Sequence, residues 1–323
     1  MKVRRLSASL AVAWWMAASG RVLAAAYAGS SEAGELELPG SALAVVAGSA
    51  TPGLSRDALA VRENPARLGE AGTAGAAATY ALHAGGLTDS QIAAYIGQGS
   101  AGVFGASLRL VQASIPITLE DGAGGYGGTQ GHADVQTIVG TFGWAPDLSL
   151  LAESLGTAVR AGLSATFLNR DMAGQGEGGA GGGAAVWVPC GRGMSAFGIV
   201  RNVGWTESWI WPVEASAGAA VDWGDVLVSG AGLRGSLAGT WSRERGVTGA
   251  AGIEYGIGGG DLVGAAIRAG YEIGTVRALG KWPSGGLAVR IGGLSVEIGI
   301  GSMGGLGLER IVTLSYRESA AGG

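Results

Sequence analysis

The sequence has few charged residues, two histidines and one cysteine. Charged residues make up 14% of the 323 residues, against roughly 25% in an average soluble domain. The lone cysteine, Cys190, excludes an internal disulfide, and two histidines beside it are too few for a structural metal cluster. The net charge of −4 excludes the basic surface typical of nucleic-acid-binding proteins. We therefore expect no bound metal, no cofactor and no nucleic-acid partner.

Long apolar runs are also missing. Beyond residue 30 the sequence contains no stretch of about 18 apolar residues that could form a spanning helix, yet its mean hydropathy is +0.32. Strands that are apolar at alternate positions reconcile these two properties. Glycine is abundant, at 64 residues, but aromatic and branched apolar residues recur between the glycines without a short repeat. This distribution excludes a disordered or fibrous chain.

The first 28 residues have the layout of a secretory signal peptide. Met1 to Arg5 is basic, residues 6–18 are mostly apolar, and small residues that fit a cleavage site follow at Ala24 to Ala28. The apolar segment is too short to span a membrane comfortably, which argues against a retained anchor helix. We expect an exported protein.

From about residue 72 onward, apolar residues alternate with small or polar residues. Leu294, Val296 and Ile298 share one face of a predicted strand, and Ser295 and Glu297 share the other, because successive side chains of a strand point to opposite sides. The second face carries mostly small residues, which fits a crowded barrel interior better than open water. The pattern predicts fourteen strands, an even number as expected for a bacterial barrel. They lie near 73–82, 90–97, 102–111, 134–144, 157–169, 182–189, 195–202, 213–221, 225–235, 248–257, 262–272, 285–291, 294–301 and 309–317.

The predicted connections alternate between short turns and longer loops. Turns are expected at 222–224, 258–261 and 292–293, and a small helix at 148–154. Longer loops are expected at 112–133, 171–181, 203–212, 236–247 and 273–284. Tryptophans, among them Trp144, Trp205, Trp211 and Trp223, lie at predicted strand ends or in loops, where interfacial aromatic residues belong.

Charged residues on the small, inward face are the candidate functional residues. Four of them lie on successive strands, and two lie elsewhere on the inward face: Glu254, Arg268, Arg290 and Glu297, then Arg109 and Arg160. One interpretation is a ladder of salt bridges that fixes strand register, since a single buried charge is costly. The other is a polar site that holds the headgroup of a ligand or docks a plug.

Catalytic motifs are weak in this sequence. Two matches to G-x-G-x-x-G, at 122–127 and 299–304, are expected by chance in so glycine-rich a chain, and neither lies in a βαβ unit. No nucleophile-elbow sequence is present. We predict that the protein is not an enzyme and has no catalytic residues.

At the level of the whole chain, the sequence resembles the PorV/PorQ family of outer-membrane proteins, within the class of long-chain fatty-acid-transporter-like barrels. The residues that carry the resemblance are Gly40 to Ala50, Asp57-Ala58, Asn64-Pro65-Ala66, Ser195 to Gly204, Gly252 to Tyr255, Ile267 to Tyr271, Gly286 to Ile291 and Leu308 to Tyr316. The sequence departs from the family before Asn64, where Arg62-Glu63 replaces the usual aromatic residue. The resemblance implies a plug segment inside the lumen (29–70) and a transmembrane β-barrel of fourteen strands (71–317). The signal peptide (1–28) precedes them, and a polar tail (318–323) follows, where the family ends in an aromatic residue.

The resemblance also singles out Asp57, Asn64 and Pro65 as plug or hinge residues. Asn-Pro is a frequent turn initiator, so this motif either serves as a gate or simply links the plug to the first strand.

Three functions stay open at this point. The first is an outer-membrane transporter or channel for hydrophobic or small molecules. The second is a carrier that binds exported proteins in type IX protein secretion, and the third is a structural outer-membrane protein. We expect a location in the bacterial outer membrane, with outer-membrane lipid and the barrel-assembly machinery as partners, together with a hydrophobic ligand or an exported protein.

Overall fold

The computed structural model describes most of the chain beyond residue 33. The described residues are 34–70, 72–83, 86–120, 126–149, 153, 158–172, 174–206, 210–224, 230–243, 246–258, 263–274, 283–302 and 308–318. The expected signal peptide (1–28) and residues 319–323 of the expected tail lie outside this part. Within it, no helix has the length and apolar character needed to cross a membrane.

The described chain begins with short helical elements. They are η1 (Gly34–Glu37), α2 (Ala42–Ala47), η2 (Gly48–Gly53), α3 (Ala60–Glu63) and η3 (Pro65–Glu70). The hydroxyl of Ser41 caps α2 by accepting a hydrogen bond from the backbone N–H of Ala44 at 2.9 Å. All six residues of α2 are buried, so this helix is enclosed on every side.

Fourteen strands follow, and one short helical turn, η5 (Gly99–Ala101), connects two of them. The strands are β1 (Ala74–Leu82), β2 (Thr88–Gly97), β3 (Val103–Glu120), β4 (Tyr126–Ala145), β5 (Arg160–Met172), β6 (Gln175–Gly191), β7 (Met194–Thr206), β8 (Glu214–Gly224), β9 (Ala231–Ser242), β10 (Gly246–Ile257), β11 (Val263–Gly274), β12 (Ser284–Ile291), β13 (Leu294–Ser302) and β14 (Leu308–Arg317).

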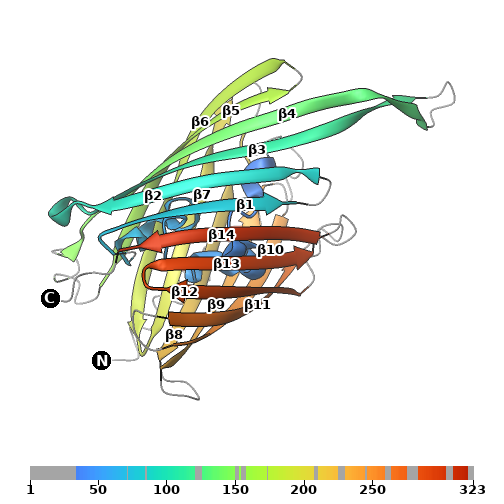
Figure 1. Cartoon of the computed structure of the whole chain (residues 1–323). Coiled ribbons are helices and arrows are strands. Elements are labelled where there is room, and N and C mark those ends of the chain that lie inside the picture. Colours follow the sequence, from blue (N-terminus) through green and yellow to red (C-terminus); the bar gives the residue numbers. More distant parts are fainter. Residues whose placement is uncertain are drawn as a thin grey trace.

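These strands form one closed barrel in which each strand pairs antiparallel with its sequence neighbours (Figure 1). The first and last strands close it, with Thr79 of β1 opposite Thr313 of β14. The predicted transmembrane barrel of fourteen antiparallel strands is therefore confirmed. We name the end of the barrel at which β1 begins and β14 ends the terminal end, and the opposite end the hairpin end.

The two faces of the wall follow the predicted alternation. On β13 the side chains of Val296 and Ile298 are 41% and 46% exposed on the outside, whereas Glu297 between them is 8% exposed. Leucine, isoleucine, valine and aromatic residues cover the outer face of most strands. An apolar exterior of this extent is what a barrel surrounded by lipid requires.

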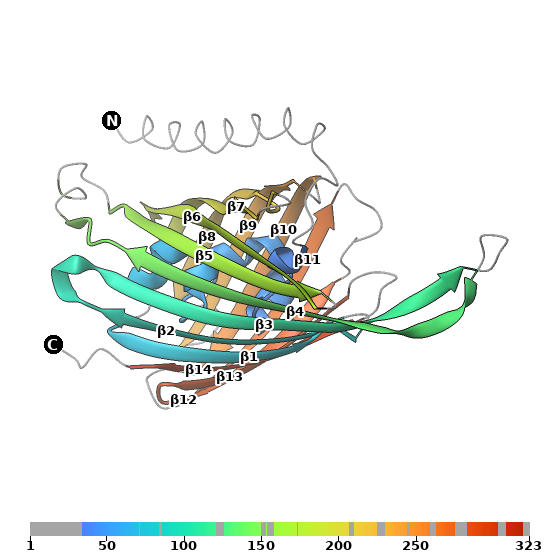
Figure 2. The ribbon, with the colours of Figure 1, turned by 90° about the horizontal axis from the view of Figure 1, so that it is seen from above.

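The helical segment at residues 36–70 lies inside the barrel, and we call it the plug (Figures 1 and 2). The buried apolar clusters of the protein lie between this plug and the inner wall. One of them consists of Ala42 and Val45 of α2, Ala81 of β1 and Ile311 of β14. The plug therefore packs across the seam where the first and last strands meet.

Several predicted loops are wrong, because the segments concerned belong to strands. Residues 112–120 and 126–133 extend β3 and β4, residues 171–172 and 175–181 belong to β5 and β6, and residues 236–242 belong to β9. The predicted strand at 225–235 is displaced, since β9 starts at Ala231, and the predicted turn at 222–224 is the end of β8. Residues 126–133 and 175–181 are rich in glycine, which signals turns in soluble proteins. In a barrel, antiparallel neighbours hold such backbone extended, as Gly178 opposite Asn169 shows.

The predicted two-residue turn at 292–293 is confirmed. Most of the predicted helix at 148–154 and of the turn at 258–261 lies outside the described residues.

The hairpin of β3 and β4 extends far beyond its neighbours. Pairing of β3 with β2 ends at Gln112, and pairing of β4 with β5 ends at Val135, but β3 and β4 stay paired with each other as far as Glu120 and Tyr126. Figure 2 shows this two-stranded arm reaching past the rim at the hairpin end. Residues 112–120 and 126–133, expected to lie in a loop, are thus the strands of a projecting β-hairpin.

Candidate functional site in the barrel lumen

Inward-facing glycines let the plug approach the wall closely. A methyl group at Gly270 of β11 would overlap the carbonyl oxygen of Val46, and one at Gly299 of β13 would overlap the carbonyl oxygen of Ala42. The absence of a side chain at these positions brings the backbone of α2 directly against the wall.

Hydrogen bonds from the wall hold the plug in place. The backbone N–H of Ala42 donates to the hydroxyl of Thr313 at 2.9 Å, and the backbone N–H of Ser49 donates to the carboxylate of Glu272 at 2.7 Å. The hydroxyl of Ser284 donates to the carbonyl of Val46 at 2.5 Å. These contacts reach strands β11, β12 and β14, so the plug is anchored to a wide sector of the wall.

Three of the predicted inward charges form one ladder with a residue that the sequence reasoning missed. Arg268 of β11 donates to Glu254 of β10 at 2.6 Å and to Glu297 of β13 at 2.5 Å. Arg234 of β9 also pairs with Glu254. The two carboxylates are 4% and 8% exposed. Register brings these residues together, because Arg234, Glu254 and Arg268 are directly opposite one another on successive strands.

Arg290 lies on the same wall but outside the ladder. It is exposed and lines a cavity at the terminal end. Within the described part of the chain, no carboxylate forms an ion pair with it. Two of the four charges predicted on successive strands are thus bound to Arg268, and Arg290 is left facing the lumen.

Arg109 and Arg160, the two other predicted charges, each contact the plug. Arg109 is 1% exposed, donates to Asp89 of β2 at 2.9 Å and reaches the carbonyl of Leu38 at 3.2 Å. Arg160 pairs with Glu70 of η3. Both arginines therefore link the barrel wall to the plug.

His83 lies beside the Arg109 cluster at the end of β1. Its Nδ1 atom is 3.0 Å from Glu309 of β14, and its Nε2 atom is 3.4 Å from Asp89. The imidazole thus connects carboxylates on two strands. In the described residues, no group of three or more histidine, cysteine or acidic side chains could hold a metal ion.

A second charged cluster surrounds Arg67 of the plug. Arg67 is fully buried, donates to Glu70 at 2.6 Å and to the carbonyl of Gly53 at 2.6 Å, and lies 4.2 Å from the centre of the Trp187 ring. Burial lowers the pKa of Arg67 to about 10, against the opposing effect of Glu70, which leaves it charged at neutral pH. A buried cation of this kind needs its carboxylate and aromatic partners.

In the Asn64-Pro65-Ala66 motif, Asn64 caps the end of α3, and Pro65 and Ala66 begin η3. Asn64 is fully buried and donates through its amide to the carbonyl of Pro52 at 3.0 Å. A methyl group at Gly162 of β5 would overlap the backbone of Pro65 and Ala66. The motif is packed against the wall, and the rest of η3 separates it from β1.

Asp57 precedes α3, and its carboxylate accepts a hydrogen bond from the backbone N–H of Leu59 at 2.9 Å. Burial, together with the nearby carboxylates of Glu297 and Glu63, raises the pKa of Asp57 from 3.8 to about 7. This side chain is therefore close to half protonated at neutral pH.

We expect Asp57→Asn to stabilise the protein at alkaline pH. The folded state holds the Asp57 proton up to about pH 7, and the unfolded state releases it near pH 3.8, so ionisation weakens the folded state progressively between these values. The gain in thermal midpoint of Asp57→Asn, followed by circular dichroism in detergent, should be near zero at pH 4 and largest at pH 8. Asp134→Asn, on the exposed part of β4, is the control. An equal gain at both pH values would contradict the prediction.

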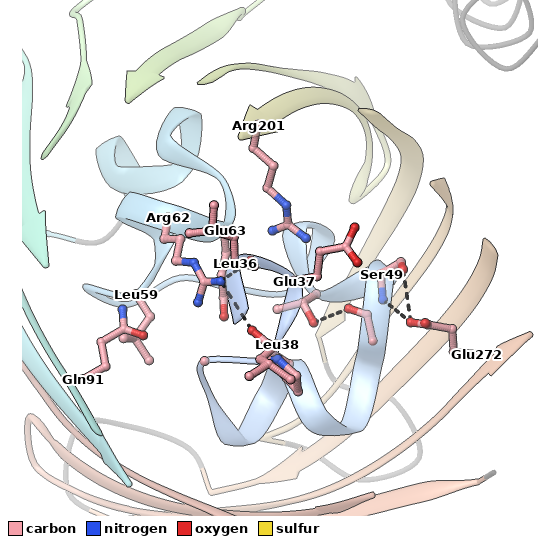
Figure 3. A pocket seen from close by; sticks show the side chains of 15 residues that line it. Leu36, Glu37, Leu38, Ser49, Leu59, Arg62, Glu63, Gln91, Arg201 and Glu272 are labelled. Carbon is pink, nitrogen blue, oxygen red and sulfur yellow. Dashed lines mark hydrogen bonds between the residues drawn. The ribbon is translucent and has the colours of Figure 1, made fainter. Parts of the chain in front are cut away.

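A small pocket of about 40 Å³ lies between the plug and the wall toward the hairpin end. Figure 3 shows Arg62 at its centre, donating to the carbonyls of Leu36 at 2.5 Å and Leu38 at 3.4 Å, with Gln91 and Arg201 on the surrounding wall. This volume suits one water molecule, whose share of liquid volume is roughly 30 Å³. The pocket cannot hold a ligand.

Trp211, predicted at the membrane interface, is instead fully buried in the lumen. It packs with Leu36, Val139 and Leu168. Glycines of β6 and β7 make room for it, since a methyl group at Gly179, Gly181 or Gly204 would lie within 3.0 Å of the indole. The prediction was wrong for Trp211, which closes the gap between plug and wall. Trp144, Trp205 and Trp223 are on the outside, with 39%, 68% and 45% of their surface exposed.

Two larger cavities lie at the terminal end. One, which we call the vestibule, has a volume of about 350 Å³, and the other, the side cavity, has a volume of about 250 Å³. The ion pair between Arg56 of the plug and Asp222 of β8 lines both. Arg234 of β9 lines both as well, so the two cavities adjoin.

The architecture is similar to that of solved channel proteins. The toluene transporter TbuX of Ralstonia pickettii matches with a TM-score of 0.52 and 11% identity over 88% of this chain and 99% of its own. The toluene transporter TodX of Pseudomonas putida matches with a TM-score of 0.54 and 8% identity over 86% and 97%. The monoaromatic hydrocarbon channel CymD matches with a TM-score of 0.56 and 9% identity over 86% and 98%. No protein-family model and no curated protein matches the sequence. At these identities, the likeness extends to the fold alone.

Proposed function

We propose that the protein is an outer-membrane channel for small hydrophobic molecules, and that residues 36–70 act as its movable plug. The barrel has an apolar exterior, and proteins of the same architecture transport toluene or other monoaromatic hydrocarbons. In the described residues, the carboxylates of the ladder and of the Arg67 cluster are bound to arginines of the wall or the plug, and Arg290 and Arg317 have no base or nucleophile paired with them. Transport therefore fits this interior better than catalysis.

The observation that carries the proposal is how the plug fills the lumen. It packs on the wall at glycines and apolar clusters, is held there by hydrogen bonds and ion pairs, and leaves cavities of about 350 and 250 Å³ at the terminal end. A cavity of roughly 150 Å³ already holds benzene in a protein interior. Each cavity can therefore accept one small ring, and a limited movement of the plug would connect them to the rest of the lumen.

Locking the plug to the wall tests this function. The hydroxyls of Ser49 in η2 and Thr248 in β10 lie 3.2 Å apart, so Ser49→Cys with Thr248→Cys is expected to form a disulfide. Cys190, which is exposed and free, is replaced by serine in the same protein. In vesicles containing the purified protein, uptake of toluene should fall to the rate of protein-free vesicles when the pair is oxidised. Dithiothreitol should restore it.

The single variant Ser49→Cys in the same background is the matched control, and its uptake should be insensitive to oxidation. Equal uptake in the locked and reduced states would contradict plug movement. Uptake no faster than in protein-free vesicles, with the plug free, would remove the channel function and leave a structural role. Cell fractionation with a heat-modifiability gel tests the outer-membrane location separately.

A carrier role in type IX protein secretion is the second candidate. It follows from the PorV/PorQ resemblance, and the projecting β3–β4 hairpin gives it a surface that an exported protein could contact. Deleting residues 114–133 should then abolish co-purification of an exported protein while leaving toluene uptake intact. If the genome that encodes this protein has no genes for a type IX translocon, this role is excluded.

A further inference from the structure

The vestibule contains two arginines without acidic partners. Arg290 of β12 and Arg317 of β14 both line it, and no described carboxylate forms an ion pair with either side chain. The three other arginines of this cavity are paired, Arg56 with Asp222 and both Arg234 and Arg268 with Glu254. Arg290 and Arg317 thus stand apart from the ladder and the plug contacts.

Register places two hydroxyls between these arginines. Ser295 of β13 is opposite Arg290 on one side and opposite Ser315 of β14 on the other, and Arg317 follows two residues after Ser315 on the same face. The outer two of three neighbouring strands are about 10 Å apart, a gap that two long arginine side chains can close around one bound group. The Ser295 hydroxyl already donates to Glu297 at 3.3 Å, so the guanidinium groups, with the Ser315 hydroxyl, are the donors offered to a carboxylate.

The balance of charge in the vestibule favours an anion. Its lining has five arginines and four acidic residues. Three of the acids, Asp222, Glu254 and Glu297, are engaged by Arg56, Arg234 and Arg268. Only Asp57 is left to offset Arg290 and Arg317. A negatively charged ligand would gain charge-assisted hydrogen bonds there without displacing an existing ion pair.

The plug supplies an apolar surface to the same cavity. Leu43 and Leu54, which are 9% and 4% exposed, line it together with Ala288 of β12. The cavity volume of about 350 Å³ exceeds the roughly 150 Å³ that hold benzene, but it is far too small for a long extended chain. The vestibule therefore matches a compact molecule with one apolar part and one acidic group.

We propose that the vestibule binds small carboxylates with an apolar part about the size of one aromatic ring, with Arg290 and Arg317 on the carboxylate and Leu43 and Leu54 on the ring. The proposal rests on the channel function above and narrows its cargo: the molecules that pass are acidic ring compounds as well as neutral ones. Arg290 and Arg317 then act as the groups that select for charge at the terminal end.

Binding of sodium benzoate and of benzyl alcohol to the purified full-length protein in detergent tests the proposal, because the two probes share a ring and differ in charge. We expect benzoate to bind more tightly by titration calorimetry. Arg290→Gln with Arg317→Gln should weaken benzoate binding by roughly tenfold or more, as expected for the loss of charged hydrogen bonds, and leave benzyl alcohol unchanged. Arg290→Lys with Arg317→Lys should retain most of the preference. Arg310→Gln, an exposed arginine that faces outward on β14, is the matched control.

Equal binding of the two probes to the unaltered protein would overturn the proposal. So would unchanged benzoate affinity in the glutamine variant, or an equal loss in Arg310→Gln. A heat-modifiability gel checks that each variant is folded, and the lysine variant gives a second reading if the glutamine variant fails. Toluene uptake separates the two proposals: its absence would remove the channel function while selective benzoate binding still supports the site.

Discussion

Placing alanine at both Gly270 and Gly299 is expected to drive α2 out of the lumen and open the barrel. Each new methyl group would overlap a backbone carbonyl of the plug, at Val46 and Ala42 respectively. Backbone cannot yield as a flexible side chain does, so either the helix or the wall must shift. The wall strands are paired on both sides, whereas α2 is held by a few hydrogen bonds of about 0.5–1.5 kcal/mol each and by its apolar contacts. The plug is the part that moves.

Single-channel recording in planar bilayers measures this effect. The unaltered protein should give at most brief, small currents, and the double variant should give steady currents typical of an open pore. Gly239→Ala is the control, since a methyl group at Gly239 has no atom within 4 Å, and its currents should match those of the unaltered protein. If the currents of the double variant match those of the unaltered protein, the plug tolerates the overlap. The close approach at Gly270 and Gly299 would then not be what holds the plug in place.

Removal of Arg268 is expected to cause the largest loss of stability. Glu254 and Glu297 are 4% and 8% exposed. Among the described residues, Arg268 is the one arginine paired with Glu297, and Glu254 keeps Arg234 alone when Arg268 is removed. Breaking a buried ion pair by removing one partner typically costs about 3–5 kcal/mol. We expect Arg268→Ala to lower the free energy of unfolding by about this amount, measured by urea titration in lipid vesicles.

The interpretation of these charges as a salt-bridge ladder predicts the stability of a second variant at the same residues. If the cost arises from stranded carboxylates, the triple variant Arg268→Met, Glu254→Gln and Glu297→Gln should recover most of the loss, because neutral groups need no buried partner. Arg310→Ala on the outer face should change the free energy of unfolding by less than about 0.5 kcal/mol, as is usual for surface positions. A deficit in the triple variant as large as that of Arg268→Ala would mean that packing, and not charge pairing, is the contribution of Arg268.

Much of the barrel could be predicted because its walls follow a local rule. Alternation places Leu294 and Ile298 outside and Glu297 inside whatever the neighbouring strands are, and it brought Glu254, Arg268 and Glu297 to the inner face. Strand ends were harder to predict. Gly176 to Gly181 suggested a loop, but pairing with β5 and β7 holds this segment extended, and pairing is not visible in one strand alone.

The plug contacts could not be predicted from periodicity, because they join distant parts of the chain. Glu70 meets Arg160 ninety residues away, and Arg56 meets Asp222 across the lumen. Neither pair has a spacing that marks it in the sequence. Trp211 illustrates the same limit. Its position after a strand suggested the membrane interface, but glycines of β6 and β7 leave room for the indole inside the lumen, and the side chain points inward. Arg234 is different, since it lay in a predicted strand and its inward direction could have been inferred.

The packing of α2 over the seam has a consequence for biogenesis. Ala42 and Val45 contact both Ala81 of β1 and Ile311 of β14, and Ala42 also donates to Thr313. The first and last strands are the paired strands farthest apart in the sequence, and all the other strands of the wall lie between them in the chain. A segment synthesised before the wall thus offers a surface on which its two ends can align. The plug of the finished channel would also act, during assembly, as a template for closure of the barrel.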